Sequence, residues 1–272
     1  SLALLDGHNN ESRVVAAGSI WLLLCPSDSA GHNNNQIDPQ ATTLDSLLCP
    51  SDSAGERFFQ DDSKNNGRQF AKGNYAAYVS PIHLECLRQF PAAIAEVDQD
   101  LRKISDGTSQ TMAFAEVLTR EDQFDERGVW ALNLSGATLL AFDMHNAFSS
   151  NVVIACGGDK KGYSKNPYSP AQQSVGGDDS TKGPNHQHFT NSGIKAEWLR
   201  SCPEDSKFEG MGCRTGGTSG YAAPRSNHPG GVNTARVDGS VQFLNDEVDS
   251  YLMARMISIN DGEGLVEGPF AR

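Results

Sequence analysis

His228 and Asp238 are the residues of this sequence whose types and spacing first suggest chemistry. A histidine that acts as a general base is commonly oriented by a carboxylate, and the two side chains must then lie within hydrogen-bond distance. The residues between them, 232–237, have strand composition, and a strand of that length separates its ends by about 17–20 Å. We therefore interpret His228 and Asp238 as turn residues at opposite ends of a strand and expect their side chains to lie well apart.

Two further segments contain side chains that bind metals in other proteins. His186 and His188 would share one face of a strand and could bind a metal there, but spacing places no third ligand, so we prefer to interpret them as part of a solvated loop. Asp178 and Asp179 offer oxygen atoms that suit calcium, although no EF-hand spacing is present. GGTSGY at 216–221 fails the Gly-x-Ser-x-Gly pattern of a nucleophile elbow, and the sequence contains no Walker or dinucleotide motif. We expect no catalytic residues and no cofactor, with calcium at Asp178 and Asp179 kept as a hypothesis.

The six cysteines include no Cys-x-x-Cys pair, which argues against a zinc ribbon or a thioredoxin-type site. Cys202 and Cys213 flank a polar segment without apolar core residues, so we predict a local disulfide between them; two unrelated free thiols are the alternative. A disulfide would indicate an oxidising compartment outside the cytoplasm. The sequence does not determine the pairing of the other four, Cys25, Cys49, Cys86 and Cys156.

The charge of the chain restricts its partners. Its 272 residues include 22 basic and 34 acidic ones, for a net charge of −12. Because phosphate groups would be repelled, we expect no nucleic-acid partner. The longest apolar runs, at 20–25 and 137–142, are far shorter than the roughly 20 residues of a membrane helix, so we expect no membrane insertion by this chain. The opening SLALLDGHNNES lacks a basic region, which is typical of a mature or trimmed chain.

Apolar residues occur in strand-sized clusters separated by turn-forming residues. We predict strands at 74–81, at 111–120, within 128–142 as one or two strands, and at 151–156. In the second of these, we place Met112 and Phe114 on one face, with Glu116 as a third candidate for the same face.

Two segments have helical periodicity. Apolar residues recur at helical spacing over 91–104, which predicts a helix there. A second helix is predicted over 245–257, where Asn245 provides a cap and acidic residues follow in the first turn. The chain therefore combines several strands with few helices, which is an α+β composition.

Long irregular segments separate these elements. Residues 1–70 contain the nonapeptide LLCPSDSAG twice, at 23–31 and 47–55, and each copy indicates an apolar strand end that leads into a turn. Residues 157–193 form a long loop or insertion. We treat 1–272 as a single globular domain that carries this loop-rich insertion.

NTARVDGSVQFL, near the C-terminus, indicates a β-hairpin with Asp-Gly in its turn. A two-residue turn would pair Arg236 with Val241 and mix polar and apolar side chains on both faces. A three-residue loop, with Gly239 in the left-handed conformation of a bulge, pairs Arg236 with Ser240 and Ala235 with Val241. We prefer the second register because it separates the polar face from the apolar one.

The segment AAPRSNHPGGVNTARVDGSVQFLNDEVD resembles the C-terminal signature of a large bacterial family of pilin-like proteins. These are identified as type II secretion G-like pseudopilins with a C-terminal His-x9-Asp-Gly domain. LLCPSDS, GNYAAYVS and ISDGTSQTMAFAEV resemble further family elements in the same order, so the resemblance covers roughly residues 45–262. The doubled Cys-Pro-Ser-Asp element departs from the family pattern. The signature positions are His228, Gly230, Gly231, Asp238 and Gly239.

The resemblance implies a pilin-like head, with an antiparallel sheet, few helices and long loops, and the family's N-terminal hydrophobic helix is absent from this chain. It implies an exported, non-enzymatic protein of the cell envelope or exterior that assembles with copies of itself or with other pilin-like subunits. The alternatives are an extracellular module that uses the loop at 157–193 to bind a glycan or calcium, and an exported hydrolase.

Overall fold

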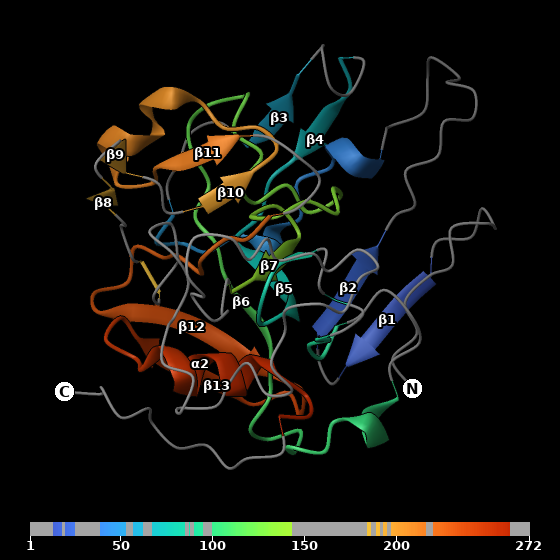
Figure 1. The fold of residues 1–272 in the computed structure, drawn as a ribbon. Helices are drawn as coiled ribbons and strands as arrows, with labels where there is room; N and C mark the ends of the chain where they lie inside the picture. Colours follow the sequence, from blue (N-terminus) through green and yellow to red (C-terminus); the bar gives the residue numbers. More distant parts are fainter. Residues whose placement is uncertain are drawn as a thin grey trace, which may run out of the picture.

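The computed structural model is centred on a five-stranded sheet and has the α+β class predicted from the sequence (Figure 1). The sheet order is β13-β12-β6-β5-β7, and neighbouring strands are antiparallel except for the parallel pair β5 and β7. Its strands are β5 (Tyr75–Ser80), β6 (Met112–Glu116), β7 (Leu139–Ala141), β12 (Gly231–Arg236) and β13 (Val241–Asn245). The structure describes residues 13–17, 20–24, 39–52, 57–61, 67–84, 87, 90–94, 100–142, 184–185, 189–190, 193–194, 197–215 and 220–261.

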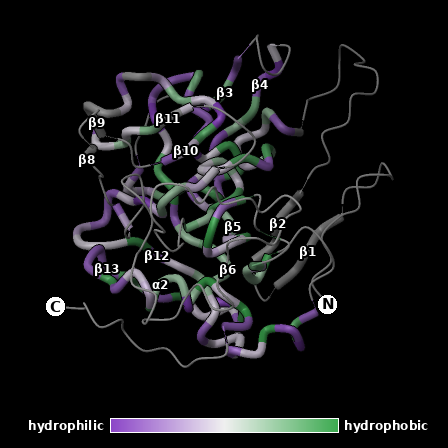
Figure 2. The backbone as a smooth tube through the Cα atoms, in the orientation of Figure 1, coloured by the Kyte–Doolittle hydropathy of each residue, from purple (hydrophilic) through white to green (hydrophobic). Residues whose placement is uncertain are grey.

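Strand β5 lies inside the molecule with apolar side chains on both faces. Tyr78 packs into the main core with residues of β12, whereas Ala77 and Val79 pack with Ile94 in a second cluster. Successive side chains of a strand point to opposite faces, so a strand buried on both faces carries apolar side chains on both. Figure 2 shows apolar segments gathered around β5. The prediction of a strand at 74–81 is confirmed.

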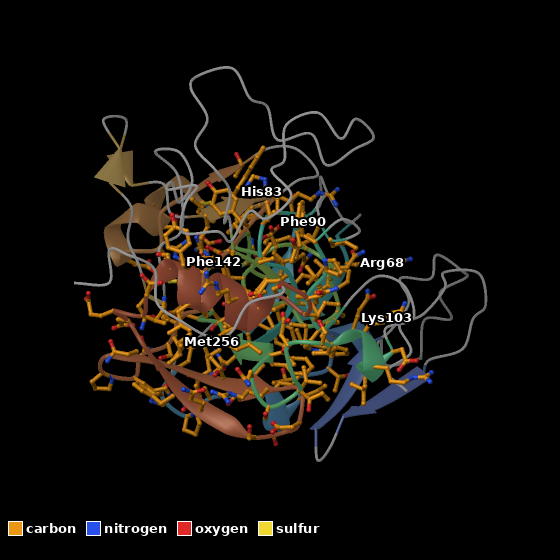
Figure 3. All side chains as sticks on the ribbon, turned by 60° about the horizontal axis from the view of Figure 1, so that its bottom comes forward. Arg68, His83, Phe90, Lys103, Phe142 and Met256 are labelled. Carbon is orange, nitrogen blue, oxygen red and sulfur yellow. A yellow bond between two sulfur atoms is a disulfide. The ribbon has the colours of Figure 1, made fainter. Side chains whose placement is uncertain are left out.

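Helix α2 (Ser250–Ile257) follows the hairpin and closes the main core. Met253, Met256 and Ile257 are buried in the cluster that also contains Phe142 (Figure 3). The helix begins later than the sequence predicted, because the side chain of Asp249 accepts the hydrogen bond from the Leu252 amide. Among the described residues, no helix has the length and apolarity needed to cross a membrane.

The hairpin β12–β13 has the predicted three-residue loop. The Arg236 amide donates to the Ser240 carbonyl over 2.9 Å, Ala235 pairs with Val241, and Gly239 has φ of +85°. The predicted register is therefore confirmed. The apolar face is not buried along β13, however, since Val241 and Phe243 are 69% and 46% exposed.

The predicted helix over 91–104 is wrong for the residues that the structure describes. Ala92 forms a β-bridge with Ser258, and its amide donates to the Val79 carbonyl over 3.0 Å. The Ile94 amide is likewise directed to the Tyr78 carbonyl. These sheet-type bonds to β5 override the helical periodicity, and a single 3-10 turn, η4 (Leu101–Lys103), remains.

One or two strands were predicted within 128–142, and the structure has one strand there, β7, which covers only Leu139–Ala141. Gly128 and Gly136 both have positive φ, at +77° and +73°, which interrupts any extended strand before Leu139. The second nonapeptide contains the predicted turn, with the Asp52 amide bonded to the Cys49 carbonyl, but a 3-10 helix precedes it in place of a strand. The strand predicted at 151–156 and most of the loop predicted at 157–193 lie outside the described residues.

Short elements surround the central sheet (Figure 1). Strands β10 and β11 are parallel, and the other pairs, β1–β2, β3–β4 and β8–β9, are antiparallel. The strands are β1 (Arg13–Ala17), β2 (Ile20–Leu24), β3 (Phe58–Gln60), β4 (Gln69–Ala71), β8 (Phe189–Thr190), β9 (Gly193–Ile194), β10 (Glu197–Leu199) and β11 (Cys213–Thr215). The remaining 3-10 turns are η1 (Pro39–Ala41), η2 (Asp45–Leu47) and η5 (Glu204–Glu209).

A buried ion network joins β10 to the segment that follows β6. Arg127 donates to Glu197 Oε2 over 2.6 Å and to Asp125 Oδ2 over 2.8 Å, and Arg225 donates to Glu197 Oε1 over 2.9 Å. Arg120 approaches Asp125 at 3.4 Å. All five side chains are buried, so Arg127, Arg225, Glu197 and Asp125 compensate one another's charge, while Arg120 also pairs with the exposed Glu209 over 2.6 Å.

Candidate functional site

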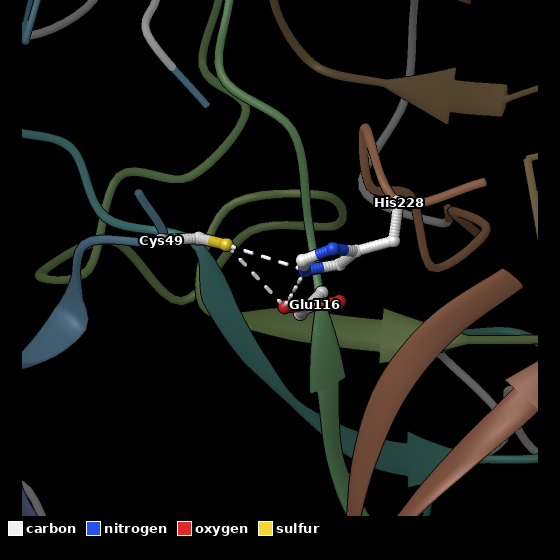
Figure 4. Close-up of side chains that lie close together, drawn as sticks. All are labelled: Cys49, Glu116 and His228. Atoms are coloured by element: carbon white, nitrogen blue, oxygen red, sulfur yellow. Dashed lines mark hydrogen bonds and ion pairs between the residues drawn. The ribbon is translucent and has the colours of Figure 1, made fainter. Parts of the chain in front are cut away.

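Three side chains from distant parts of the chain meet at one end of β6 (Figure 4). Cys49 Sγ lies 3.5 Å from His228 Nε2 and 3.5 Å from Glu116 Oε1, and His228 Nε2 lies 3.2 Å from Glu116 Oε1. A thiol, a carboxylate and an imidazole thus converge on a common point.

Cys49 is held by a network of buried polar side chains. Its amide donates to Asn74 Oδ1 over 2.9 Å, and the Asn74 side chain also donates to Asp52. Asp52 in turn accepts from the amide and the hydroxyl of Thr119, at 3.0 and 2.8 Å. This network fixes the turn that starts at Cys49 against the segment after β6, so the thiol has a defined position.

Glu116 is the last residue of β6, and the neighbouring strand β12 orients its carboxylate. The Asn233 amide donates to Oε2 over 2.7 Å, and the Asn233 side chain donates to Oε1 over 3.1 Å. Register places Glu116 opposite Tyr75 on β5. The carboxylate is therefore fixed in the sheet at the position where β5, β6 and β12 meet.

His228 reaches the site from the turn that precedes β12. Its amide donates to the Ser226 hydroxyl over 3.1 Å, and that hydroxyl donates to the Gly231 carbonyl over 2.7 Å. Asn227 donates to the Ser51 carbonyl over 3.0 Å, which ties this turn to the one that contains Cys49. The imidazole points from this turn toward Glu116 (Figure 4).

The site is largely closed to solvent. Glu116 and Cys49 are buried, while the His228 side chain is 31% exposed and forms the accessible side. Burial raises the pKa of the neighbouring Tyr75, and negative charge on Glu116 and Cys49 raises it further. When protonated, His228 forms an ion pair with Glu116, with 3.2 Å between Nε2 and Oε1.

The geometry fits metal ligation better than nucleophilic catalysis. In a Cys-His-acid triad the thiol and the acid bind different ring nitrogens, so that the acid fixes the tautomer. Here Nε2 of His228 contacts both Cys49 and Glu116. Three donor atoms thus converge on one point, and the second ring nitrogen of His228 does not connect the thiol to the acid. This is the arrangement of a set of metal ligands.

Asp238 is far along the hairpin from this cluster. It lies in the β12–β13 turn, where its carboxylate accepts from the amide and the hydroxyl of Ser240 at 2.9 and 2.7 Å. The hydrogen bonds from Ser240 lower the pKa of Asp238. Strand β12 separates Asp238 from His228, as predicted, and the two are not a catalytic pair.

The glycines of the signature have separate structural roles. Gly239 supplies the left-handed turn of the hairpin, and Gly230, with φ of +82°, turns the chain into β12. Gly231 lies against β13, where a side-chain carbon would overlap the Leu244 carbonyl and lie 2.8 Å from the Phe243 ring.

The predicted disulfide between Cys202 and Cys213 is present, with 6.6 Å between the two Cα atoms. It connects the segment after β10 to the start of β11. The calcium candidates Asp178 and Asp179 lie outside the described residues, as do His186 and His188.

His228 stood out in the sequence, but Cys49 and Glu116 were not predicted to be its partners. The chain separates His228 from Glu116 by 112 residues and from Cys49 by 179, so no local spacing rule connects them. One signal was present: the three residues come from three of the segments that carry the family resemblance, LLCPSDS, ISDGTSQTMAFAEV and the His-Pro-Gly-Gly element.

Comparison with known proteins identifies a family for nearly the whole chain. The family described as "Protein of unknown function (DUF1559)" matches residues 2–251, a range that includes all three residues of the cluster. No curated protein and no solved structure matches the chain. The chain therefore belongs to the DUF1559 family.

Proposed function

We propose that this chain is a non-enzymatic, exported, pilin-like or pseudopilin-like structural protein that assembles into a filament or surface structure with copies of itself. Membership of the DUF1559 family and the ordered set of motifs support the pilin-like assignment. The disulfide between Cys202 and Cys213 supports an extracellular or cell-envelope location, because such bonds persist in oxidising compartments.

The observation that carries the assembly proposal is the surface of β13. Val241 and Phe243 are exposed on this strand, and within the described residues β13 pairs with β12 alone, at the end of the sheet. The strand sequence VQFLN contains no charge and no proline, the features that usually prevent edge strands from associating. An uncharged, apolar edge strand favours contact with another protein surface.

Light scattering after size-exclusion chromatography, with negative-stain imaging, tests this proposal. We expect oligomers whose mass increases with protein concentration and with salt, because screening reduces repulsion between chains of charge −12. Combining Val241→Asp with Phe243→Asp should raise the concentration needed for assembly by about tenfold or more, given the apolar burial lost.

Leu101→Asp combined with Phe124→Asp is the matched control, because these side chains are 42% and 48% exposed and lie outside the hairpin. The control pair should assemble like the unmodified chain. Monomers under all concentrations and salt conditions would refute assembly, and equal loss in both double variants would refute the role of β13.

A further inference from the structure

We propose that Cys49, Glu116 and His228 bind one zinc ion, with water at the fourth coordination position. The three donor atoms are separated by 3.5, 3.5 and 3.2 Å. Zinc bonds are about 2.3 Å to sulfur and about 2.0–2.2 Å to nitrogen and oxygen, so a tetrahedral ion holds its donor atoms about 3.3–3.6 Å apart. The two distances from sulfur, 3.5 Å each, fall in this range and the third, 3.2 Å, lies about 0.1 Å below it, so the observed triangle is close to one face of a zinc tetrahedron.

The chemistry of the donors selects the metal. Sulfur and imidazole ligands suit zinc, whereas calcium and magnesium take oxygen ligands. A thiolate and a carboxylate together balance the double positive charge of zinc, and a neutral imidazole adds none. This balance matters because Glu116 and Cys49 are buried, and an uncompensated charge there would be costly.

Hydrogen bonds around the three residues orient them as ligands. Asn233 binds both carboxylate oxygens of Glu116, and the Ser51 hydroxyl lies 3.1 Å from Cys49 Sγ. Such contacts hold metal ligands in place and typically contribute 10–100-fold to metal affinity. The partial exposure of His228 provides a route by which water and the ion can reach the site.

The ion would join three segments that lie far apart in the sequence. Cys49 belongs to the turn after η2, Glu116 ends β6, and His228 precedes β12. Zinc at this point would act as a structural cross-link between the N-terminal turn and the C-terminal hairpin. This structural role does not involve Val241 and Phe243, the exposed side chains of β13 on which the assembly proposal rests.

Cobalt substitution tests the proposal in the full chain with its disulfide intact. After chelator treatment, we expect one Co²⁺ per chain, with a thiolate-to-cobalt charge-transfer band and the visible spectrum of a tetrahedral ion, and displacement by Zn²⁺. Cys49→Ser should lose the charge-transfer band. Glu116→Gln and His228→Gln should weaken metal binding by about 100-fold or more, and Asn233→Ala by about 10–100-fold.

Two controls separate this site from other thiols and from misfolding. A variant that combines Cys25→Ser, Cys86→Ser and Cys156→Ser should retain the full cobalt spectrum. In the unmodified chain, Zn²⁺ should slow alkylation of Cys49 at least about tenfold, as mapped by mass spectrometry, because a metal-bound thiolate is less reactive. This second measurement requires no substitution.

The proposal is overturned if the chain takes up no stoichiometric Co²⁺, if Cys49→Ser keeps the charge-transfer band, or if Zn²⁺ leaves Cys49 alkylation unchanged. Retention of zinc by the variant with Val241→Asp and Phe243→Asp would show that metal binding stands apart from assembly.

Discussion

Glu197 lies between two arginines in the buried ion network. Arg127 and Arg225 each donate to one of its carboxylate oxygens, at 2.6 and 2.9 Å. Burial on its own would raise the pKa of Glu197, but the charges and hydrogen bonds of Arg225 and Arg127 lower it below its ordinary value of 4.5. Folding therefore makes this carboxyl group harder to protonate.

This depressed pKa predicts loss of stability in acid. A group whose pKa is lower in the folded state contributes stability above its unfolded pKa, and that contribution is lost as pH falls through the folded pKa. We expect the free energy of unfolding, measured with urea at pH 7, 5, 4 and 3, to fall below about pH 4.5. Glu197→Gln should destabilise the protein by about 3–5 kcal/mol at pH 7 and flatten this dependence.

Glu209→Gln provides the comparison. Glu209 also pairs with an arginine, Arg120, at 2.6 Å, but its side chain is largely exposed, so its removal should cost less than about 1 kcal/mol. If the two substitutions cost the same, the buried network does not contribute as described.

At the scale of elements, the hairpin β12–β13 depends on close contact at its open end. Gly231 pairs with Asn245 at the first position of β12, and no space exists there for a side-chain carbon. At Gly230, one residue earlier, a side-chain carbon would have no neighbouring atom within 4 Å, although the φ of this residue is +82°. Adjacent glycines are thus required for different physical reasons.

Alanine substitutions at these two glycines should therefore differ. Gly231→Ala must displace the Leu244 carbonyl and should cost about 3 kcal/mol or more. Gly230→Ala incurs only backbone strain, about 1–2 kcal/mol, and Gly230→Asn should cost less because asparagine tolerates this conformation. Urea unfolding measures both, and an equal or reversed order would contradict the steric argument.

At the scale of the whole molecule, two kinds of contact connect the central sheet to the region of β10 and β11. One is the buried ion network, and the other is isolated β-bridges such as the one between Ala141 and Ala222. Within the region of β10 and β11, the disulfide between Cys202 and Cys213 closes a short loop. Cys202 and Cys213 pack against the main hydrophobic core, which also contains Leu199 of β10, so the disulfide ties this loop to the core.

Removal of this disulfide should destabilise the molecule measurably. Combining Cys202→Ala with Cys213→Ala restores the entropy of the unfolded loop and should lower the free energy of unfolding by about 2–4 kcal/mol. Reductant should destabilise the unmodified chain by a similar amount and leave the double variant unchanged. If reductant affects the variant equally, another pair of cysteines is responsible.

Local patterns predicted much of this fold, and contacts between distant residues account for most of the errors. Strands β5 and β6, the bulged hairpin and helix α2 followed from periodicity and turn residues, because their own side chains determine them. The helix predicted over 91–104 was wrong because Ala92 and Ile94 bond to β5, a contact that no local pattern encodes. The cluster at His228 was missed for the same reason.

The pairing of β6 with β12 also has a consequence for the order of folding. Glu116 contacts His228, which lies 112 residues later in the sequence. The centre of the sheet therefore closes only after β12 is available to pair with β6. Contacts of such large sequence separation slow folding, and until then one edge of β6 has no strand beside it. While the chain emerges from its N-terminus, this edge stays unpaired until β12 follows, and chaperones that bind extended strands would bind it there.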